Sequence, residues 1–179
     1  MSTEYHGTTI LCLKKGDKTV IMADGQATMG SVVAKSNTRK LMRLDKFGVV
    51  AGMAGNASDG LILMELVEKK LNQYSGQLIR SVIELCKDWR TDKYLKHLEA
   101  TIIVADKDNR IMLTGNGGAM ESDKPVCAIG SGGYFALSAA TALMDIEGLD
   151  ALEIAKRSMK IAADLCVYTN HNFVIEEIN

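Results

Sequence analysis

The sequence predicts an α+β fold: a four-layer αββα sandwich of two antiparallel sheets flanked by helix pairs. Strand and helix signals come in blocks, in the order strands, two helices, strands, two helices, strand. A Rossmann-type parallel sheet would instead alternate single strands with single helices. Short turn sequences between successive strand signals also favour antiparallel hairpins. Because the chain contains no internal repeat, linker or low-complexity tract, we expect a single folded domain.

The first block of strands consists of two hairpin signals. β-Branched and apolar runs at 8–13 and 19–23 surround KKGDK, whose glycine suits a tight turn. The loop DGQATMG and a short apolar stretch come next. LMRL at 41–44 and GVVAGMAG at 48–55 then flank 45–47, which predicts a second hairpin.

The chain then changes to a helical period. Segments 61–71 and 78–89 predict two helices that pack as a pair. Apolar residues of the second segment recur at i, i+4, i+7 and i+11: Leu78, Val82, Leu85 and Trp89. Strand signals return at 100–105 and 110–115, which flank DKDN and predict a third hairpin, and at 126–129.

Two helices and a strand complete the chain. Segment 134–146 is rich in alanine and leucine. Asp150 and Glu153 form an Asp-x-x-Glu capping box that predicts the start of a long helix. We expect three apolar residues on one face of this helix: Ile154, Ile161 and Leu165. A final strand is predicted at 172–175.

Composition limits the possible functions. The chain has 179 residues, 47% hydrophobic and 24% charged, as is usual for a globular protein with a sizeable core. With 21 basic and 22 acidic residues, its net charge of -1 does not favour nucleic acid or an anionic membrane as a partner. We expect a cytoplasmic location, because neither a spanning apolar run nor a signal-peptide pattern is found.

The four cysteines do not suggest a metal or disulfide framework. Cys12, Cys86, Cys127 and Cys166 lie far apart in apolar surroundings, without a CxxC pair or histidines at metal-ligand spacing. We expect them to be reduced core residues.

The stretch HGTTIL allows two interpretations. Thr8 and Thr9 are either ordinary β-formers at a strand edge, or the chain is cut after Gly7 and Thr8 becomes its first residue. An N-terminal threonine can be a catalyst, because its hydroxyl attacks while its own α-amine, whose pKa is ordinarily about 7.7 to 8.0, accepts the proton. The sequence leaves both interpretations open at this point.

Four other residues could complete such a catalyst. Lys40 would keep the pKa of the amine low, and Asp24 would hold the lysine. Gly52, expected in a strand-to-helix turn, could donate a backbone N–H to an oxyanion. The Ser131 hydroxyl could exchange a proton with the catalytic amine. Each residue also has an ordinary interpretation. Lys40 and Asp24 could be surface charges, Gly52 could belong to a structural turn, and Ser131 could be a helix N-cap.

Other polar motifs give weaker signals. GNGGAM and GSGGYF do not match the nucleotide-binding glycine patterns. His6, His97 and His171 are scattered and do not suggest a triad. We interpret Asp164 as a helix residue near the site rather than as an acid catalyst.

The motifs of the chain resemble those of a known family in order and spacing: TTIL, DGQAT, AGMAG, KDWRTDKYLKHLEA, TGNG, AIGSGG and YTNH. They are similar to the proteolytic subunits of HslUV-type ATP-dependent proteases, bacterial relatives of proteasome β-subunits in the N-terminal-nucleophile hydrolase superfamily. The likeness runs from Thr8 nearly to the C-terminus. The string KDWRTD…LEA with the opening TTI is highly specific, whereas AIGSGG alone is not.

The resemblance implies an N-terminal-nucleophile hydrolase fold and a threonine-type endopeptidase. It places the nucleophile at Thr8, the catalytic lysine at Lys40 and its paired aspartate at Asp24. The oxyanion-hole amide falls on Gly52 and the supporting serine on Ser131. It also implies that sodium or another cation is bound by backbone carbonyls at the end of the last long helix: Ala163, Cys166 and Thr169.

The resemblance further implies the partners. These are a homo-oligomer of two stacked hexameric rings, unfolded protein substrates, and a hexameric HslU-type ATPase that alone uses ATP, with no cofactor for catalysis. The chain departs from the family at Ala23 and Ala163, where glycine is common, and at Gly118, where aspartate is usual. None of these changes removes a catalytic group. The extension MSTEYHG predicts a propeptide at 1–7 before a single peptidase domain at 8–179.

Two other functions remain open from the sequence. The chain could be a free-standing N-terminal-nucleophile amidase that acts on a small substrate. It could also be a catalytically silent ring subunit, if the extension is retained and the Thr8 nitrogen stays acylated.

Overall fold

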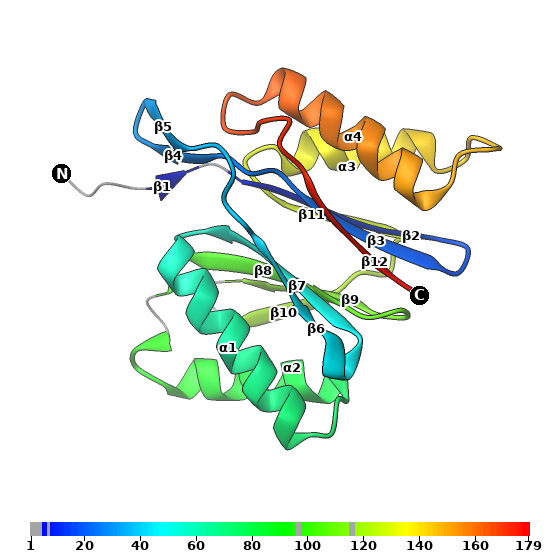
Figure 1. Ribbon diagram of the computed structural model, residues 1–179. Helices are drawn as coiled ribbons and strands as arrows, with labels where there is room; N and C mark the ends of the chain where they lie inside the picture. The colour runs from blue at the N-terminus through cyan, green and yellow to red at the C-terminus, as the bar shows by residue number, and fades with distance from the viewer. Residues whose placement is uncertain (1–4, 7, 96–97, 115–116) are drawn as a thin grey trace.

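A computed structural model describes residues 5–6, 8–95, 98–114 and 117–179. Two antiparallel sheets face each other, and a helix pair covers the outer face of each sheet (Figure 1). The four layers are therefore helices, sheet, sheet and helices. This arrangement confirms the αββα sandwich that the block order of the sequence predicts.

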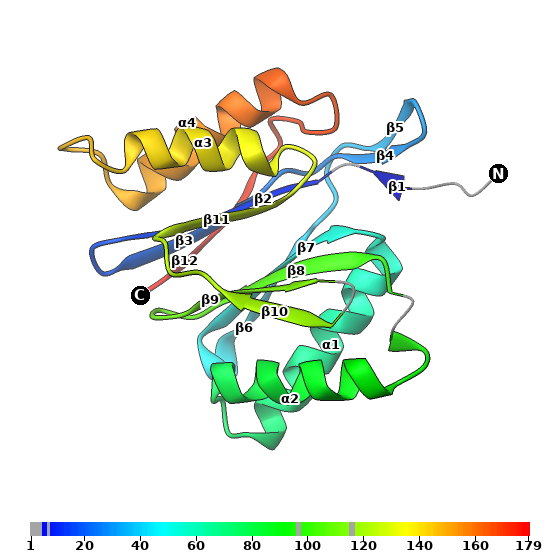
Figure 2. The same cartoon turned by 180° about the vertical axis from the view of Figure 1, so that it is seen from behind.

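The first main sheet has four strands in the order β11-β2-β3-β12. Their bounds are Val126–Gly130 for β11, Thr9–Lys15 for β2, Lys18–Ala23 for β3 and Val174–Ile178 for β12. Helices α3 (Gly133–Leu143) and α4 (Ala151–Leu165) cover its outer face. Figure 2 shows α3 running beside β11. The tight turn between β2 and β3 contains Gly16 at φ 61°, as the predicted hairpin requires.

The second main sheet has five strands in the order β10-β9-β8-β7-β6. Their bounds are Gly118–Glu121 for β10, Arg110–Thr114 for β9, Ala100–Ala105 for β8, Val49–Gly55 for β7 and Leu41–Leu44 for β6. The short 3-10 helix η1 (Asp45–Phe47) joins β6 to β7. Helices α1 (Ala57–Gln73) and α2 (Leu78–Thr91) cover the outer face.

A small third sheet lies at one end of the sandwich, in the order β1-β4-β5 (Figure 1). Strand β4 (Ala27–Met29) and strand β5 (Val32–Lys35) form a hairpin, and the two-residue β1 (Tyr5–His6) pairs with β4. This hairpin was not predicted, because DGQATMG has the composition of a loop and the strands are short. Strand β10 was not predicted either.

The core explains why the central strands are apolar on both faces. In β2, Ile10 and Cys12 pack between the two sheets, whereas Leu11 and Leu13 pack under α3 and α4. Successive side chains of a strand point to opposite faces, so a strand buried on both sides reads as a continuous apolar run. The third apolar cluster lies under α1 and α2 and contains Trp89.

The N-termini of two helices are set by side-chain caps, one of them predicted and one not. Helix α1 begins at Ala57, before the predicted 61. Its N-cap is Asn56, whose side chain accepts hydrogen bonds from the N–H groups of Ser58 and Asp59. In α4, Asp150 accepts from the Glu153 N–H at 2.8 Å, which confirms the predicted N-terminus.

The predicted apolar face of α4 is only partly correct. Ile154 is buried, but Ile161 and Leu165 are 41% and 61% exposed. The buried face instead uses small residues such as Ala155 and Ala162, which let the helix lie close to the sheet.

The remaining predictions are close to the observed bounds. Helix α3 begins at Gly133 and ends at Leu143, slightly ahead of the predicted 134–146. The third hairpin is confirmed, although Gly115 lies outside the described residues. The last strand begins at Val174 rather than at 172.

The prediction of reduced core cysteines is confirmed for Cys12, Cys127 and Cys166 and only in part for Cys86. All four thiols are free, and three are buried while Cys86 is half-buried. Within the part of the chain that the structure describes, no helix has both the length and the apolar character needed to span a membrane.

Candidate active site

Three of the candidate residues meet at one end of the two main sheets. Thr8 directly precedes β2, Asp24 directly follows β3, and Lys40 directly precedes β6. Because β2 and β3 are antiparallel neighbours, the start of one lies beside the end of the other. All three residues are buried, with exposed fractions of 5%, 0% and 3%.

Asp24 holds Lys40 in a fixed position. The Lys40 Nζ donates to Asp24 Oδ1 at 2.8 Å. The same carboxylate accepts three backbone N–H groups, from Thr9 at 2.7 Å, from Gln26 at 2.9 Å and from Asn170 at 3.3 Å. Charge-assisted bonds of this kind orient a carboxylate strongly, so the ammonium group that it binds is also oriented.

The lysine ammonium lies beside the start of β2. The Thr9 N–H and the Lys40 Nζ share one oxygen, Asp24 Oδ1, so the two nitrogens are neighbours. Burial lowers the pKa of Lys40 from its usual value, although the Asp24 carboxylate acts in the opposite direction. A desolvated ammonium next to Thr8 acts on nearby charges more strongly than a solvated one would.

A glycine loop closes on the Thr8 backbone. Gly130, the last residue of β11, pairs with Thr9 and has φ +89°. A Cβ at this position would clash with the Thr8 carbonyl oxygen, so only glycine fits. Ser131 follows and is exposed, and Gly132 rather than Ser131 is the N-cap of α3. The N-cap interpretation of Ser131 is therefore wrong.

Gly52 lies in the middle of β7, so its predicted place in a strand-to-helix turn is wrong. It faces Leu41 of β6 on one side and Ile103 of β8 on the other. A Cβ at Gly52 would come within 2.9 Å of side-chain atoms of Ile10 and Leu41. The missing side chain therefore allows the two sheets to pack closely at this point.

Gly55 occupies the turn that was predicted for Gly52. It ends β7 with φ +99° and precedes Asn56, the N-cap of α1. The Met53 N–H donates to the Lys40 carbonyl oxygen at 3.0 Å. Backbone N–H groups alternate between the two edges of a strand, so the N–H groups of Met53 and Gly55 point to the same edge of β7. This is the edge that faces β6, and Gly55 lies beyond the point where β6 begins.

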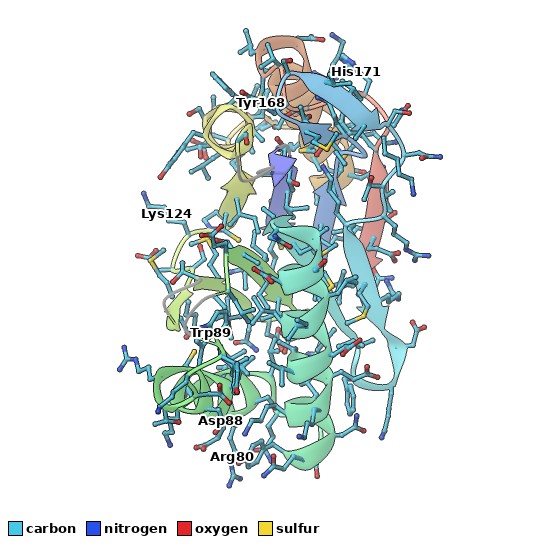
Figure 3. The ribbon with its side chains drawn as sticks, turned by 90° about the vertical axis from the view of Figure 1, so that its left-hand side faces the viewer. Arg80, Asp88, Trp89, Lys124, Tyr168 and His171 are labelled. Carbon is cyan, nitrogen blue, oxygen red and sulfur yellow. The ribbon has the colours of Figure 1, made fainter. Side chains whose placement is uncertain are left out.

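The end of α4 also reaches the site. The Thr169 Oγ1 lies 2.7 Å from the Thr9 Oγ1, and the Thr169 N–H donates to the Cys166 carbonyl at 3.0 Å. Ala163 lies in the last turn of the same helix, whose carbonyl end carries partial negative charge. In Figure 3, Tyr168 and His171 are at this end of the molecule, far from Trp89 on α2.

Asp164 is a surface helix residue and not part of the buried cluster. Its carboxylate accepts from Lys160 Nζ at 2.5 Å and pairs with His171 Nε2 at 2.8 Å. Lys160 first and His171 second lower the pKa of Asp164. The expectation of a helix residue is confirmed.

Gln26 and Asn170 were not predicted as site residues, although both bind Asp24 through backbone N–H groups. The Gln26 Nε2 also donates to Thr28 Oγ1 and to the Val167 carbonyl. Both residues lie within motifs that carry the family resemblance, DGQAT and YTNH, and this was the signal that could have identified them.

The αββα sandwich, with a buried lysine–aspartate pair beside a threonine at the start of β2, defines a proteasome-type N-terminal-nucleophile hydrolase. The model of the family described as proteasome subunit matches residues 4–178. The chain therefore belongs to the proteasome subunit family, within its HslV branch, as the following similarities establish.

The chain is 55% identical over 171 residues to the ATP-dependent protease subunit HslV of Sulfurihydrogenibium sp., covering 96% of each chain. It is 55% identical over 174 residues to the same subunit of Rickettsia prowazekii, covering 97% of this chain and 96% of the relative. The crystal structure of eukaryotic HslV from Trypanosoma brucei matches with a TM-score of 0.91 and 42% identity, covering 96% of this chain and 99% of that one. The chain is thus a threonine-type peptidase subunit of an ATP-dependent protease, as the motifs indicated.

Proposed function

We propose that Thr8 becomes the N-terminal residue after removal of residues 1–7 and is the nucleophile of peptide-bond hydrolysis by the domain at 8–179. The observation that carries the proposal is the buried ion pair between Lys40 Nζ and Asp24 Oδ1, at 2.8 Å, beside the start of β2. A buried ion pair contributes little to the stability of a fold, because the desolvation of its two charges offsets their attraction. A role in controlling the pKa of a nearby amine explains why the pair is buried here.

The chemistry is acyl transfer followed by hydrolysis. The Thr8 Oγ1 attacks the carbonyl carbon of the substrate, and its proton passes to the Thr8 α-amine. The peptide C–N bond breaks as the ammonium returns a proton to the leaving amine, which leaves an ester on Thr8. Water then hydrolyses this ester, with the amine as the general base. Lys40 keeps the amine neutral through like-charge repulsion, and Asp24 fixes the lysine.

Backbone geometry supports Gly55, in place of Gly52, as the donor to the tetrahedral oxyanion. The N–H of Gly55 points past the start of β6, on the side where Lys40 lies, whereas Gly52 is enclosed by β6 and β8. Ser131, next to Gly130 at the Thr8 carbonyl, is the proposed hydroxyl that exchanges protons with the amine.

The extension inhibits the subunit until it is removed. Strand β1 pairs antiparallel with β4, with Tyr5 opposite Met29 and His6 opposite Thr28, so residues 5–6 of the extension lie beside the strand that follows Asp24 in the chain. With the extension in place, the Thr8 nitrogen is an amide and cannot accept a proton. We expect Thr8 to attack the Gly7 carbonyl after folding, because Lys40 and Asp24 must first be assembled.

Partners are proposed from the similarity to HslV. The subunit assembles into two stacked hexameric rings, receives unfolded polypeptides from a hexameric HslU-type ATPase and functions in the cytoplasm. Large apolar side chains exposed at several elements are suited to contacts between subunits: Val32, Val33, Tyr134, Leu165 and Val167. ATP is used by the partner, and catalysis by this chain uses its own residues only.

A cation site is proposed at the end of α4. The residues offer backbone carbonyls at Ala163, Cys166 and Thr169, and oxygen ligands of this kind suit sodium and other hard cations. The Cys166 carbonyl already accepts the Thr169 N–H and retains a second lone pair. A bound cation would hold the turn that carries Thr169 against Thr9.

Substitution of Thr8 tests the proposal. Thr8→Ala should assemble normally and cleave a fluorogenic peptide only at background rate, whereas Thr8→Ser should retain turnover because hydroxyl and amine both survive. A peptide boronate or vinyl sulfone should label Thr8 in the parent protein. Peptide cleavage by Thr8→Ala would contradict the assignment.

Assays of the parent protein with its ATPase distinguish the alternatives. ATP and the HslU-type ATPase should stimulate its cleavage of peptides and of casein. A monomeric enzyme that cuts small amides but not casein would indicate an amidase. Permanent retention of residues 1–7 without turnover would indicate a silent ring subunit.

A further inference from the structure

The segment that follows α4 forms hydrogen bonds with Thr9, with Asp24 and with residues that lie between Asp24 and Lys40 in the chain. We call residues 167–172 the anchor segment. Its Thr169 hydroxyl lies 2.7 Å from that of Thr9, and its Asn170 N–H donates to Asp24 at 3.3 Å. It approaches the site from the side opposite to the second main sheet, because α4 covers the outer face of the first sheet.

The Asn170 side chain joins two segments that are separate in the chain. Its Oδ1 accepts the Gly25 N–H at 3.2 Å, and its Nδ2 donates to the Ser36 carbonyl at 2.8 Å. Gly25 directly follows Asp24, and Ser36 begins the short connection that leads to Lys40. One amide group therefore links the backbone that carries the carboxylate to the backbone that carries the ammonium.

The two linked segments have little freedom to separate or to approach. The Thr38 N–H donates to the Gly25 carbonyl at 2.8 Å. A Cβ on Gly25 would lie only 2.6 Å from the Ser36 carbonyl oxygen, so the backbones are already in close contact. The Asn170 amide adds a side-chain bond from the anchor segment to each of them.

We propose that Asn170 is a positioning residue for catalysis: its side chain sets the placement of Lys40 relative to Asp24 and so to the Thr8 amine. The inference rests on the proposed function of Thr8, Lys40 and Asp24. Removal of the amide leaves the backbone bonds from Asn170 to Asp24 and from Thr38 to Gly25 in place, but it removes the side-chain link between Gly25 and Ser36 and so loosens the connection that carries Lys40. A displacement of about 1 Å in such a group lowers rates by about 100-fold.

Asn172 provides a matched control. Its Nδ2 also donates to the Ser36 carbonyl, at the same distance of 2.8 Å, and it is exposed. The Gly25 N–H, however, is bound to Asn170 and not to Asn172. Asn172→Ala therefore removes a hydrogen bond to the same oxygen without removing the link between the two segments.

The test compares Asn170→Ala, Asn172→Ala and the parent protein, each as the processed full assembly. For Asn170→Ala, kcat for a fluorogenic peptide and the rate of Thr8 labelling at saturating vinyl sulfone should both fall by about 10- to 100-fold. KM should change by less than about twofold, since the residue does not touch the substrate. Asn172→Ala should keep kcat within about threefold of the parent.

Other outcomes would overturn the inference. An Asn170→Ala protein with parental kcat and labelling rate, or one in which only KM rises, excludes a positioning role. An equal fall in kcat for Asn170→Ala and Asn172→Ala would indicate a merely structural contact with Ser36. If Asn170→Ala does not assemble, Asn170→Asp keeps the acceptor for Gly25 and loses the donor to Ser36, and parental kcat in that variant also overturns it. Thr8→Ala is run alongside, because activity in that variant would refute the proposed function itself.

Discussion

Two lysine–aspartate pairs of this protein have similar lengths but very different surroundings. The Lys40–Asp24 pair spans 2.8 Å with side chains 4% and 0% exposed, whereas the Lys160–Asp164 pair spans 2.5 Å with side chains 65% and 44% exposed. Water and salt screen the exposed charges, but they act weakly on the buried ones. Burial, rather than the distance between the charges, makes one pair suitable for catalysis.

The bonding of the two carboxylates differs in the same way. Asp24 accepts backbone N–H groups from three separate segments in addition to the lysine. Asp164 binds two exposed side chains, those of Lys160 and His171, at the protein surface. Asp24 is therefore part of the framework of the fold, and its loss should affect both stability and activity.

Loss of the buried carboxylate is expected to have the largest effect. Asp24→Ala leaves the N–H groups of Thr9, Gln26 and Asn170 without their acceptor and removes the partner of a buried charge. We expect the free energy of unfolding to fall by about 3 to 5 kcal/mol, with loss of peptide cleavage. Urea denaturation measures the first quantity. A fall of less than about 1 kcal/mol would show that the buried and exposed pairs do not differ as described.

Loss of the buried ammonium should separate activity from stability. Lys40→Met leaves Asp24 with three backbone donors, so we expect stability to change by less than about 2 kcal/mol. Turnover should nevertheless fall to background, and Lys40→Arg should not restore it, because a planar guanidinium cannot replace a compact ammonium. Peptide cleavage and urea denaturation of the same samples provide the comparison. Near-parental rates in either variant would reject the proposed role.

The pH dependence of stability should reveal Lys40 as well. Its pKa is lowered in the folded chain from an ordinary value of 10.5, mainly by burial. Between the two pKa values the unfolded chain binds more protons, so this group makes stability rise with pH as the pH approaches 10.5 from below. Lys40→Met should lack this component in urea titrations at a series of alkaline pH values. If the free energy of unfolding of Lys40→Met rises with pH as much as that of the parent, other groups cause the pH dependence.

The exposed pair should give the smallest effect. Because the pKa of Asp164 is lowered in the fold, its contribution is present at neutral pH and is lost as the pH falls through that pKa. At neutral pH, Asp164→Asn should shift the melting temperature by about 2 °C or less. Its kcat should remain within about twofold of the parent. Loss of turnover in Asp164→Asn would remove the distinction between the two pairs.

Strong local signals made much of the fold predictable. The apolar runs of β2 and β3, the Asp150 cap and the apolar period of α2 each specify an element without long-range information. Short strands with loop-like composition, such as β4 and β10, gave no such signal. Gly52 was misplaced because a glycine that permits sheet packing looks the same in sequence as a glycine in a turn.

The site was predictable in its chemistry but not in its supports. Thr8, Asp24 and Lys40 could be named as candidates because their side chains suit the proposed reaction, and the family resemblance favoured these roles over the ordinary alternatives. Asn170 has an ordinary amide side chain, and its backbone reaches Asp24 across 146 residues of sequence. A contact of that range follows from the packing of α4 on the first sheet, which the sequence does not display.

The central claim is that the buried pair serves an amine that belongs to Thr8. The most direct measurement is intact-mass analysis of the active protein, before and after complete reaction with a peptide vinyl sulfone. The account predicts a chain that begins at Thr8, lighter than the full sequence by MSTEYHG, with one adduct on its N-terminal peptide. Fully active protein that still begins at Met1 or Ser2 would contradict it, because the Thr8 nitrogen would then be an amide with no basic lone pair.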